Sequence, residues 1–591
     1  MGKKKRAASE APPPAVEAPP SWEGWGLTAL WAAAFFGLAL VGDQKVLRYK
    51  LLTAEAFAAA GLAWVFVSWA ARAPALWRRT ALDLPVTLYA LGGLAYYAVA
   101  PEHGAAQGEF NRVLFSAAAF FAASQTAARL PRPELAVGAW ALSGAALGLY
   151  ALLQTRGGLG PLLIPQLDRP IATFGNPIFL AAFLAASACA ALGLAGADAR
   201  RRGLWSAVAA LALAGAWTTQ TRAAFAALAA VAGMWALMTL EGRRRWTALG
   251  TLALAGLGAA WFFRGRQWTH GLIWRDTLSL WLAHPWFGCG LGRFHLEFPA
   301  HASPALRALW PESKVIVNFA HNEYLQVLAE TGVVGLALLA GVVGGWFRLA
   351  RECAARAELP RRALLGGVLA AAGVLLVQNA ASPDIRFGVS SFVVFWSLGF
   401  AAGLGWGSDV PVLLFPGRFA FAGAGLLALT LWGGMAVEPL LAQRRLFAQP
   451  SFHVEGGTEF DRAVAELEGR LKASPGDADV AENLAYLYAK ASRWPEATRY
   501  FELTARLAPT RPGPFNNLGN IAYSTGDRDG AIRWWGRSLE VGPEQVDARV
   551  NLGKTLYEMG RLKESAKNLE EVLRRDPDNE KAQVLLKKMV E

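Results

Sequence analysis

GNPIFLAAFLAASACAALGLAG, residues 175–196, is an uninterrupted apolar run without a single charged side chain. A helix needs about 20 mostly apolar residues to cross the hydrocarbon layer of a bilayer. This run therefore predicts a transmembrane helix. Similar runs rich in Ala, Leu, Gly, Val, Phe and Trp recur from about residue 24 to residue 436. The sequence thus predicts an all-α, polytopic membrane protein over this stretch.

Segments of this kind occur about thirteen times along the chain. We place them near 25–42, 51–71, 82–100, 113–128, 134–154, 175–196, 203–219, 223–240, 246–263, 324–347, 363–381, 387–406 and 413–436. The seventh and eighth are separated only by TTQTR, residues 218–222, which is a short polar break.

The orientation follows from the Lys and Arg residues of the short loops, because these residues concentrate on the cytoplasmic side. With the N-terminus in the cytoplasm, the inner loops carry more than twice as many Lys and Arg residues as the outer ones. The first outer loop, DQKVLRYK at residues 43–50, goes against this trend. An odd number of spans then puts the C-terminal region outside. We predict a multi-pass protein of the bacterial inner membrane with a periplasmic C-terminal region.

Four parts are predicted in this order. They are a disordered cytoplasmic tail at 1–23, a transmembrane domain at 24–436 with a long outer loop at 264–323, a linker at 437–457, and a helical repeat domain at 458–591. The tail is basic at its start, but Pro-rich polar sequence follows where a signal peptide would have its apolar core.

Charge and cysteine content argue against a nucleic-acid-binding protein and against a protein stabilised by metal sites or disulfides. The net charge of +13 is concentrated in loops between apolar runs, so it indicates membrane orientation and no nucleic-acid partner. The three cysteines, Cys189, Cys289 and Cys353, show neither metal-ligand spacing nor a disulfide framework. We expect no metal and no cofactor.

The C-terminal region repeats with a period of 34 residues. Prolines recur at Pro475, Pro509, Pro543 and Pro577, while Leu484, Leu518 and Leu552 keep the same period. Small residues let paired helices approach, and a proline ends the second helix of each pair. This pattern resembles the tetratricopeptide repeat, an α-solenoid. It predicts a concave surface for a protein or peptide partner, or alternatively a cap or dimerisation module, with contacts mainly inside the array.

Ionisable residues beside apolar spans are the candidates for catalysis or substrate binding. Charged side chains at membrane depth cost free energy, so those that occur there often have a function. Three outer stretches qualify. They are TTQTRAAF with Arg222, HGLIWRDTLSLWLAHPWFGCGLGRF in the long loop, and HNEYLQVLAETGVVG with His321, Asn322 and Glu323. Arginine offers paired hydrogen bonds to phosphate oxygens. Histidine has a pKa suited to deprotonating a hydroxyl near neutrality.

Together these stretches resemble the O-antigen ligase and polymerase family of membrane glycosyltransferases. His321 and Asn322, followed by Gly332 and Gly335, reproduce the family's His-Asn…Gly-x-x-Gly pattern. The long loop is similar to the family's Trp…Pro-x-x-Gly-x-Gly segment through Trp274, Pro285, Gly288, Gly290 and Gly292. TFGNPIFLAAFL, from Thr173, also looks like a family segment.

The resemblance implies a C-type glycosyltransferase fold and metal-independent transfer of a glycan from a polyprenyl-pyrophosphate carrier to an acceptor hydroxyl outside the inner membrane. Arg222 matches the arginine of the family's Ser/Thr-Arg motif, and His321 matches the motif histidine. Where the family often has a loop arginine, this chain has His270. Arg264, Arg266 and Arg275 are therefore all candidates for the second phosphate ligand.

These residues predict a single displacement that inverts the anomeric configuration. His321 would be the general base, and Arg222 would bind the pyrophosphate of the glycan donor. Asn322 and Glu323 are predicted to bind substrate, and Glu323 could instead orient the histidine. The acceptor stays open between lipid A core, a growing glycan and a protein side chain. Membrane lipid and a protein partner on the repeats complete the expected partners.

Two alternatives come from other classes. A transporter or exporter would show repeat symmetry between its halves and charges near the bilayer midplane. We see no such symmetry, and the polar clusters gather on the outer side. A membrane-anchored tetratricopeptide scaffold would give no reason for Arg222 and His321 to accompany a long outer loop.

Overall fold

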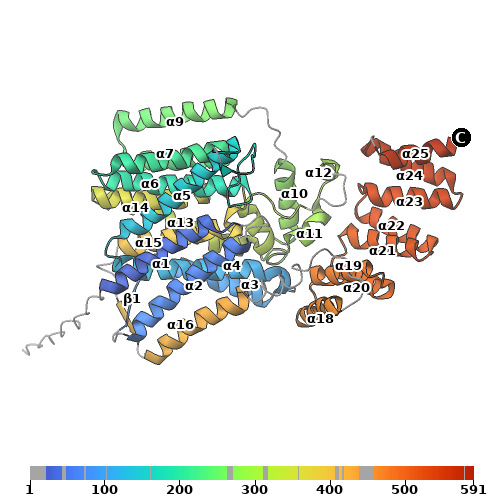
Figure 1. The fold of residues 1–591 in the computed structure, drawn as a ribbon, viewed down its shortest axis with the longest axis horizontal. Coiled ribbons are helices and arrows are strands. Elements are labelled where there is room, and N and C mark those ends of the chain that lie inside the picture. Colours follow the sequence, from blue (N-terminus) through green and yellow to red (C-terminus); the bar gives the residue numbers. More distant parts are fainter. Residues whose placement is uncertain are drawn as a thin grey trace, which may run out of the picture.

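The computed structural model describes residues 21–42, 48–71, 75–101, 103–159, 162–262, 270–309, 317–356, 358–405, 412–415, 418–437, 458–577 and 579–590. Nearly all of the predicted tail and linker lies outside these residues. The described chain forms a helical bundle, a small helical cap at one end of it, and a C-terminal array of helix pairs (Figure 1).

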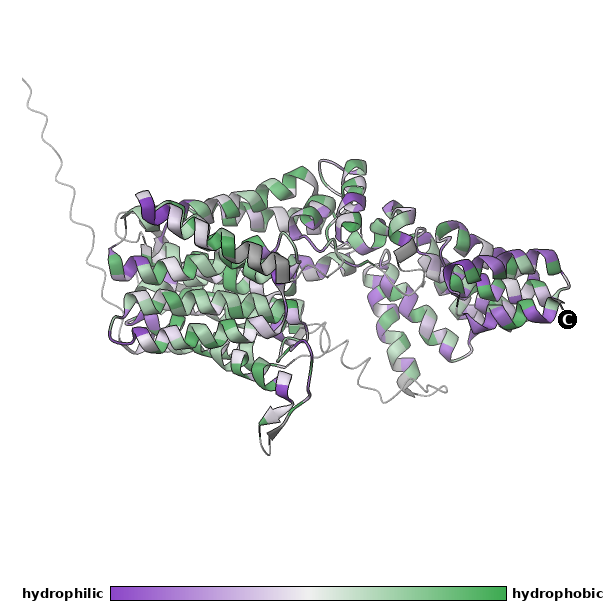
Figure 2. Cartoon of the chain, turned by 90° about the horizontal axis from the view of Figure 1, so that it is seen from above, coloured by the Kyte–Doolittle hydropathy of each residue, from purple (hydrophilic) through white to green (hydrophobic). Residues whose placement is uncertain are grey.

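Helices occupy every predicted span. The bundle helices are α1 (Ser21–Leu40), α2 (Arg48–Ala71), α3 (Asp83–Ala98), α4 (His103–Thr126), α5 (Pro133–Arg156), α6 (Pro177–Ala197), α7 (Arg202–Thr218), α8 (Arg222–Thr239), α9 (Gly242–Phe262), α13 (Glu323–Arg356), α14 (Leu359–Gln378), α15 (Val389–Gly405) and α16 (Arg418–Trp432). Within the described part of the chain, eight helices are long and apolar enough to cross a membrane. The fold is the expected all-α membrane protein, and Figure 2 shows the apolar colour running along the bundle helices.

Short elements join these helices. They are the 3-10 turns η1 (Ala127–Arg129) and η2 (Asp384–Phe387), the π-helical turn η3 (Gly433–Val437), the antiparallel pair β1 (Ala75–Arg78) with β4 (Val412–Phe415), and the antiparallel pair β2 (Gly158–Leu159) with β3 (Leu162–Leu163). The bundle core is aromatic at its centre. Phe35 stacks on Trp140 with centroids 5.0 Å apart and meets Trp396 edge-on at 4.8 Å.

The helix α4 begins about three turns earlier than its apolar pattern predicts. The predicted span began near residue 113, whereas α4 begins at His103. Its first turns carry Glu109 and Arg112, both nearly buried. Because these charges pair with other helices, the polar turns can pack inside the protein and hydropathy misses them.

The last bundle helix, α16, carries the chain across the bundle. It follows β4, which pairs with β1 at one end. At its other end, the Met435 carbonyl in η3 accepts a 2.7 Å hydrogen bond from Asn111 near the start of α4. The repeats and the cap therefore lie at the same end of the bundle (Figure 1).

The cap consists of the outer-loop helices α10 (His270–Ala283), α11 (Phe294–His301) and α12 (Pro304–Leu309). Ile273 and Leu280 of α10, Phe294 and Phe298 of α11 and Ala329 of α13 share one hydrophobic cluster. The cap is thus packed onto the start of α13.

The 34-residue period appears as three helix pairs, which are α19 (Ala478–Lys490) with α20 (Trp494–Leu507), α21 (Pro512–Ser524) with α22 (Arg528–Val541), and α23 (Val546–Glu558) with α24 (Leu562–Arg575). The single helices α18 (Thr458–Ala473) and α25 (Glu580–Val590) precede and follow these pairs. Ala497 and Ala531, at equivalent positions, are fully buried between helices. The array also contacts the cap, a contact that the prediction of mainly internal packing left out.

Candidate functional site

Two motif segments that are separate in sequence interlock at the cap end of the bundle. The Val333 amide donates to the Pro285 carbonyl at 3.0 Å, and the Gly290 amide donates to the Glu330 carbonyl at 3.0 Å. Gly332 has φ 63° and ψ −165° and kinks α13 there. A Cβ on Gly332 would collide with the Trp286 backbone, and one on Gly288 would collide with the Glu330 backbone. These glycines therefore permit a close approach of the two backbones.

His321 lies directly before α13 in a left-handed backbone conformation with φ 53°. Its imidazole stacks on that of His270, with centroids 4.7 Å apart and planes 3° from parallel. Burial, together with the charge that His270 carries when protonated, lowers the pKa of His321 to about 4. His321 is therefore a neutral imidazole at physiological pH and can accept a proton.

Asn322 and Glu323 take structural positions next to His321. The Asn322 side-chain oxygen accepts from the Leu325 amide at 3.1 Å and so caps α13. Glu323 is 1% exposed, and its carboxylate receives bonds from Arg386 at 3.2 and 3.4 Å. Within this arrangement, Glu323 contacts cations of the protein itself.

Glu323 belongs to a buried cluster of five charged side chains. Arg386 of η2 contacts Glu109 at 2.5 Å and Glu330 at 3.2 Å, besides Glu323. Arg112 contacts Glu109 at 2.9 Å and Glu323 at 3.6 Å. The nearby carboxylates raise the pKa of Arg386 above its usual range against the opposing effect of burial. The cluster joins α4, α13 and η2.

The cluster connects to the backbone beside His321 through Gln326. The Gln326 side chain donates to Glu330 at 3.0 Å and accepts from the Ala320 amide at 2.6 Å. Ala320 immediately precedes His321. A continuous chain of hydrogen bonds therefore holds the loop that carries His321 against the bundle. It runs from Arg386 through Glu330 and Gln326 to Ala320.

Arg222 begins α8 at the same end of the bundle. Its neighbour Thr221 donates to the Pro177 carbonyl at 3.3 Å at the start of α6. On that same turn of α6, the Ile178 carbonyl accepts a hydrogen bond from the Gln378 side chain at 3.4 Å. Asn379 follows Gln378 in the chain, and its carbonyl accepts from the Glu323 amide at 2.9 Å. The starts of α6, α8 and α13 are thus linked around the end of α14.

Because Arg222 lies at the start of α8, the N-terminus of that helix adds positive potential next to the arginine. The unsatisfied amides and aligned peptide dipoles of a helix N-terminus attract anions. Arg169, in the loop before α6, donates to the Thr219 carbonyl at 3.0 Å and so lies at the same α7–α8 turn. Arg169 carries no motif signal in the sequence, because only the fold brings it to this turn.

The third family segment is attached to the end of α1. Lys50 is fully buried and donates to the Leu38 carbonyl at 2.5 Å and to Thr173 Oγ1 at 3.1 Å. Its ammonium group also lies 4.2 Å from the centre of the Phe174 ring. One of the positive charges that went against the loop-charge rule is thus used inside the protein.

The other predicted phosphate ligands are the three arginines of the outer loop. Arg275 is 59% exposed and contacts its neighbour Asp276 at 3.0 Å. Arg264 and Arg266 lie outside the described residues. Within the described ranges, no three His, Cys, Asp or Glu side chains are grouped as metal ligands would be.

Residues 207–340, from α7 into α13, match the family model for O-antigen ligase. This stretch of the chain is therefore similar to the O-antigen ligase domain. The matched residues include Arg222, the cap and His321. Residues 456–512 and 516–582 match tetratricopeptide repeats. A search of the curated proteins found no match.

Several solved structures are similar to the C-terminal repeats. The tetratricopeptide domain of Arabidopsis OM64 is 18% identical, with a TM-score of 0.18, covering 19% of this chain and 93% of that one. MamA is 19% identical, with a TM-score of 0.20 and coverages of 22% and 87%. YrrB, described as a repeat protein with an unusual peptide-binding site, is 22% identical, with a TM-score of 0.20 and coverages of 22% and 77%.

Proposed function

We propose that this protein is a glycosyltransferase of the bacterial inner membrane. It transfers a glycan from a polyprenyl-pyrophosphate carrier to an acceptor hydroxyl on the periplasmic side. The observation that carries the proposal is the meeting of the ligase-family motifs, with Arg222 and a neutral His321, at one end of the bundle. The repeats lie at that same end and are therefore periplasmic as well (Figure 1).

Arg222 binds the pyrophosphate of the donor while the polyprenyl tail remains in the membrane. Paired guanidinium bonds and the start of α8 stabilise the negative charge that grows on the leaving group. Arg169, at the same turn, supplies a second cation. Arg275 of the cap, and Arg264 and Arg266 from the predicted outer loop, are the other candidates for this second contact.

His321 acts as the general base. The acceptor oxygen attacks the anomeric carbon and its proton passes to the imidazole. The bond from that carbon to the phosphate oxygen breaks, and its electron pair leaves with the polyprenyl pyrophosphate. One displacement inverts the anomeric configuration and needs no carboxylate nucleophile. The pyrophosphate anion, once bound nearby, raises the pKa of His321 and makes it a stronger base.

Glu323 and Asn322 position the histidine. Glu323 is enclosed by Arg386 and Arg112, and Asn322 caps α13, so both hold the loop from which His321 projects. His270 supports the imidazole plane by stacking. The acceptor hydroxyl belongs to a lipid, a glycan or a protein.

The test is reconstitution of the purified protein in lipid nanodiscs with a polyprenyl-pyrophosphate-linked glycan and candidate acceptors. We expect transfer with inversion, read by NMR of the product. Arg222→Ala should weaken both donor binding and turnover, and Arg222→Lys should restore little because one ammonium cannot form the paired contacts.

Arg156→Ala is the matched control, since Arg156 is an exposed arginine that ends α5 at the same end of the bundle. This variant should transfer normally. Retention of configuration, or an Arg222→Ala enzyme that works like the wild type, would refute the mechanism. Failure of every acceptor together with passage of the intact lipid-linked glycan across the membrane would favour the transporter alternative.

A further inference from the structure

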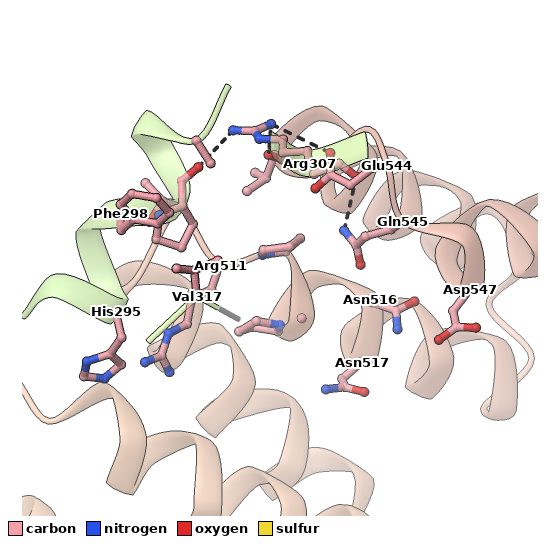
Figure 3. Close-up of a pocket in the computed structure, with 18 of the residues that line it drawn as sticks. His295, Phe298, Arg307, Val317, Arg511, Asn516, Asn517, Glu544, Gln545 and Asp547 are labelled. Atoms are coloured by element: carbon pink, nitrogen blue, oxygen red, sulfur yellow. Dashed lines mark hydrogen bonds and ion pairs between the residues drawn. The ribbon is translucent and has the colours of Figure 1, made fainter. Parts of the chain in front are cut away.

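Cavities lie at opposite ends of the bundle. One is bounded by the cap and the repeats, and polar residues such as Arg307, Asn516 and Gln545 line it (Figure 3). The other has a volume of about 850 Å³ and is bounded by α6, α7, α8, α9 and α14. It is lined by the later parts of α6 and α8 and by the first part of α14, so it lies at the end away from the cap. A volume of this size falls in the range of pockets that bind ligands.

This second cavity exists because α9 packs loosely on the bundle. The described side chains of α9 are exposed or half-buried, and the helix lies at the edge of the bundle (Figure 1). On the other side, α6 and α14 close the cavity, since a Cβ on Gly193 would lie 2.8 Å from the Gly367 Cα. Leu192 and Leu359 line the cavity and are 52% and 71% exposed. The cavity therefore opens sideways from the bundle.

The interior of the cavity is apolar. Apart from Arg202, Arg362 and Thr239, the lining residues that the structure describes are glycines or carry apolar side chains, among them Leu228 and Trp235. The Thr239 hydroxyl is used within its own helix, where it donates to the Trp235 carbonyl at 2.8 Å. An apolar space that opens sideways between membrane-spanning helices suits the acyl chains of a lipid.

Two arginines place positive charge at one end of this apolar space. Arg202 begins α7, and its Nε donates to the Ala195 carbonyl near the end of α6 at 3.3 Å. Arg362 lies in the first turn of α14, and the next residue, Ala363, packs against Gly196, where an added Cβ would lie 2.8 Å from the alanine Cβ. Both arginines therefore lie beside the end of α6.

The protein leaves this positive charge without a carboxylate partner. Among the ion pairs of the described residues, none includes Arg202 or Arg362. The nearby carboxylate of Asp198 accepts instead from the amides of Arg200 and Arg201 at 3.0 and 3.2 Å. The starts of α7 and α14 have no side-chain cap, so their amides add to the positive potential.

An apolar cavity with two such arginines at one end matches a lipid with an anionic headgroup. Guanidinium groups bind phosphate oxygens in pairs, and basic pockets between membrane-spanning helices on the cytoplasmic side bind anionic headgroups. In the proposed orientation, this cavity opens to the cytoplasmic leaflet. The lipid-linked donor is a poorer match, because its pyrophosphate lies with Arg222 at the other end of the bundle.

We propose that this cavity binds a two-chain phospholipid with an anionic headgroup, such as phosphatidylglycerol, from the leaflet opposite the transfer site. The phosphate contacts Arg202 and Arg362, and an acyl chain lies between α8, α9 and α14. This inference goes beyond the transfer reaction and does not depend on it.

The experiment is native mass spectrometry of the full-length protein, delipidated in detergent and titrated with phosphatidylglycerol or with phosphatidylcholine of the same acyl chains. The wild type should bind phosphatidylglycerol about tenfold more tightly or better. The double variant Arg202→Ala/Arg362→Ala should weaken phosphatidylglycerol binding about thirtyfold and change phosphatidylcholine binding little. Ala232→Trp places a large side chain in the cavity and should weaken the binding of both lipids.

Each variant has a matched control. Arg79→Ala/Arg348→Ala removes the same charge from the same end of the bundle, at exposed arginines that do not line the cavity. Ala230→Trp adds the same bulk to α8 at an exposed position outside the cavity. Both controls should bind phosphatidylglycerol as the wild type does, and thermal unfolding should find all four variants folded.

Three results would overturn the proposal. The first is equal affinity of the wild type for the two phospholipids. The second is an equal loss of phosphatidylglycerol binding in Arg202→Ala/Arg362→Ala and in its charge control. The third is tighter binding of a polyprenyl phosphate that displaces phosphatidylglycerol, with the same sensitivity to Ala232→Trp, because the cavity would then hold the isoprenoid chain of the carrier.

Discussion

The two junctions of this protein are built from different interactions. At the start of α13, five nearly buried charges interlock across α4, α13 and η2, with Arg386 in contact with three carboxylates. Where the cap meets the repeats, a few contacts such as His295–Asp479 join partly exposed side chains around a cavity. Buried charges demand complete pairing, whereas exposed pairs contribute little. The first junction is suited to holding one geometry, and the second to accepting a partner.

The largest expected effect is the loss of Arg386. Arg386→Ala leaves Glu109, Glu323 and Glu330 with Arg112 as the remaining cation of the cluster, and breaking a buried pair costs about 3–5 kcal/mol. Thermal unfolding in detergent measures this loss. Arg348→Ala is the control, since Arg348 is 66% exposed in its pair with Glu352 and should change stability little. Equal unfolding temperatures for the two variants would show that the buried cluster is not what holds this junction.

The second prediction concerns pH. The pKa of His321 is lowered to about 4, mainly by burial, so the folded protein keeps the imidazole neutral while an unfolded chain would protonate it near its usual pKa of about 6.5. Its contribution to stability is therefore complete above about pH 6.5 and is lost as the pH falls towards 4.

For the free enzyme, kcat/KM should stay level down to about pH 5 and then fall about tenfold per pH unit below the lowered pKa. The kcat profile should fall at a higher pH, because the bound pyrophosphate favours imidazolium. Steady-state rates at several pH values test both statements. If kcat/KM already fell below about pH 6.5, the pKa of His321 would not be lowered by burial as described.

A smaller effect is expected at Asn322. Asn322→Ala removes the cap of α13 and should cost about 1 kcal/mol. Asn322→Asp keeps the capping oxygen and should restore both stability and transfer. Thermal unfolding and transfer assays compare the two. If Asn322→Asp is stable but inactive, the amide group binds substrate, as the sequence alone predicted.

The smallest effect is expected where the cap meets the repeats. His295→Ala removes a contact between side chains that are 26% and 47% exposed, so it should destabilise the junction by no more than about 1 kcal/mol. Limited proteolysis between the bundle and the repeats reports on this docking. Complete release of the repeats by this one substitution would show that the second junction is as demanding as the first.

The sequence alone predicted the helices well, since apolar length and the 34-residue period are local properties of the chain. The histidine motif selected His321 as a candidate, and its role stays a prediction. The buried cluster escaped notice because its partners are far apart in sequence, with Arg386 and Glu323 separated by 63 positions and Glu109 more distant still. Hydropathy treats such residues as loop charges. The stacking of His270 on His321 and the docking of the cap on the repeats are also purely tertiary.

The central claim is that His321 removes the acceptor proton. The direct measurement is single-turnover transfer by His321→Ala with the lipid-linked donor already bound, alongside donor affinity. We predict a rate about a hundred- to ten-thousand-fold below the wild type, with donor binding largely kept. His284→Ala, which removes an exposed cap histidine, should react normally. A folded His321→Ala enzyme that turns over at nearly the wild-type rate would contradict the account.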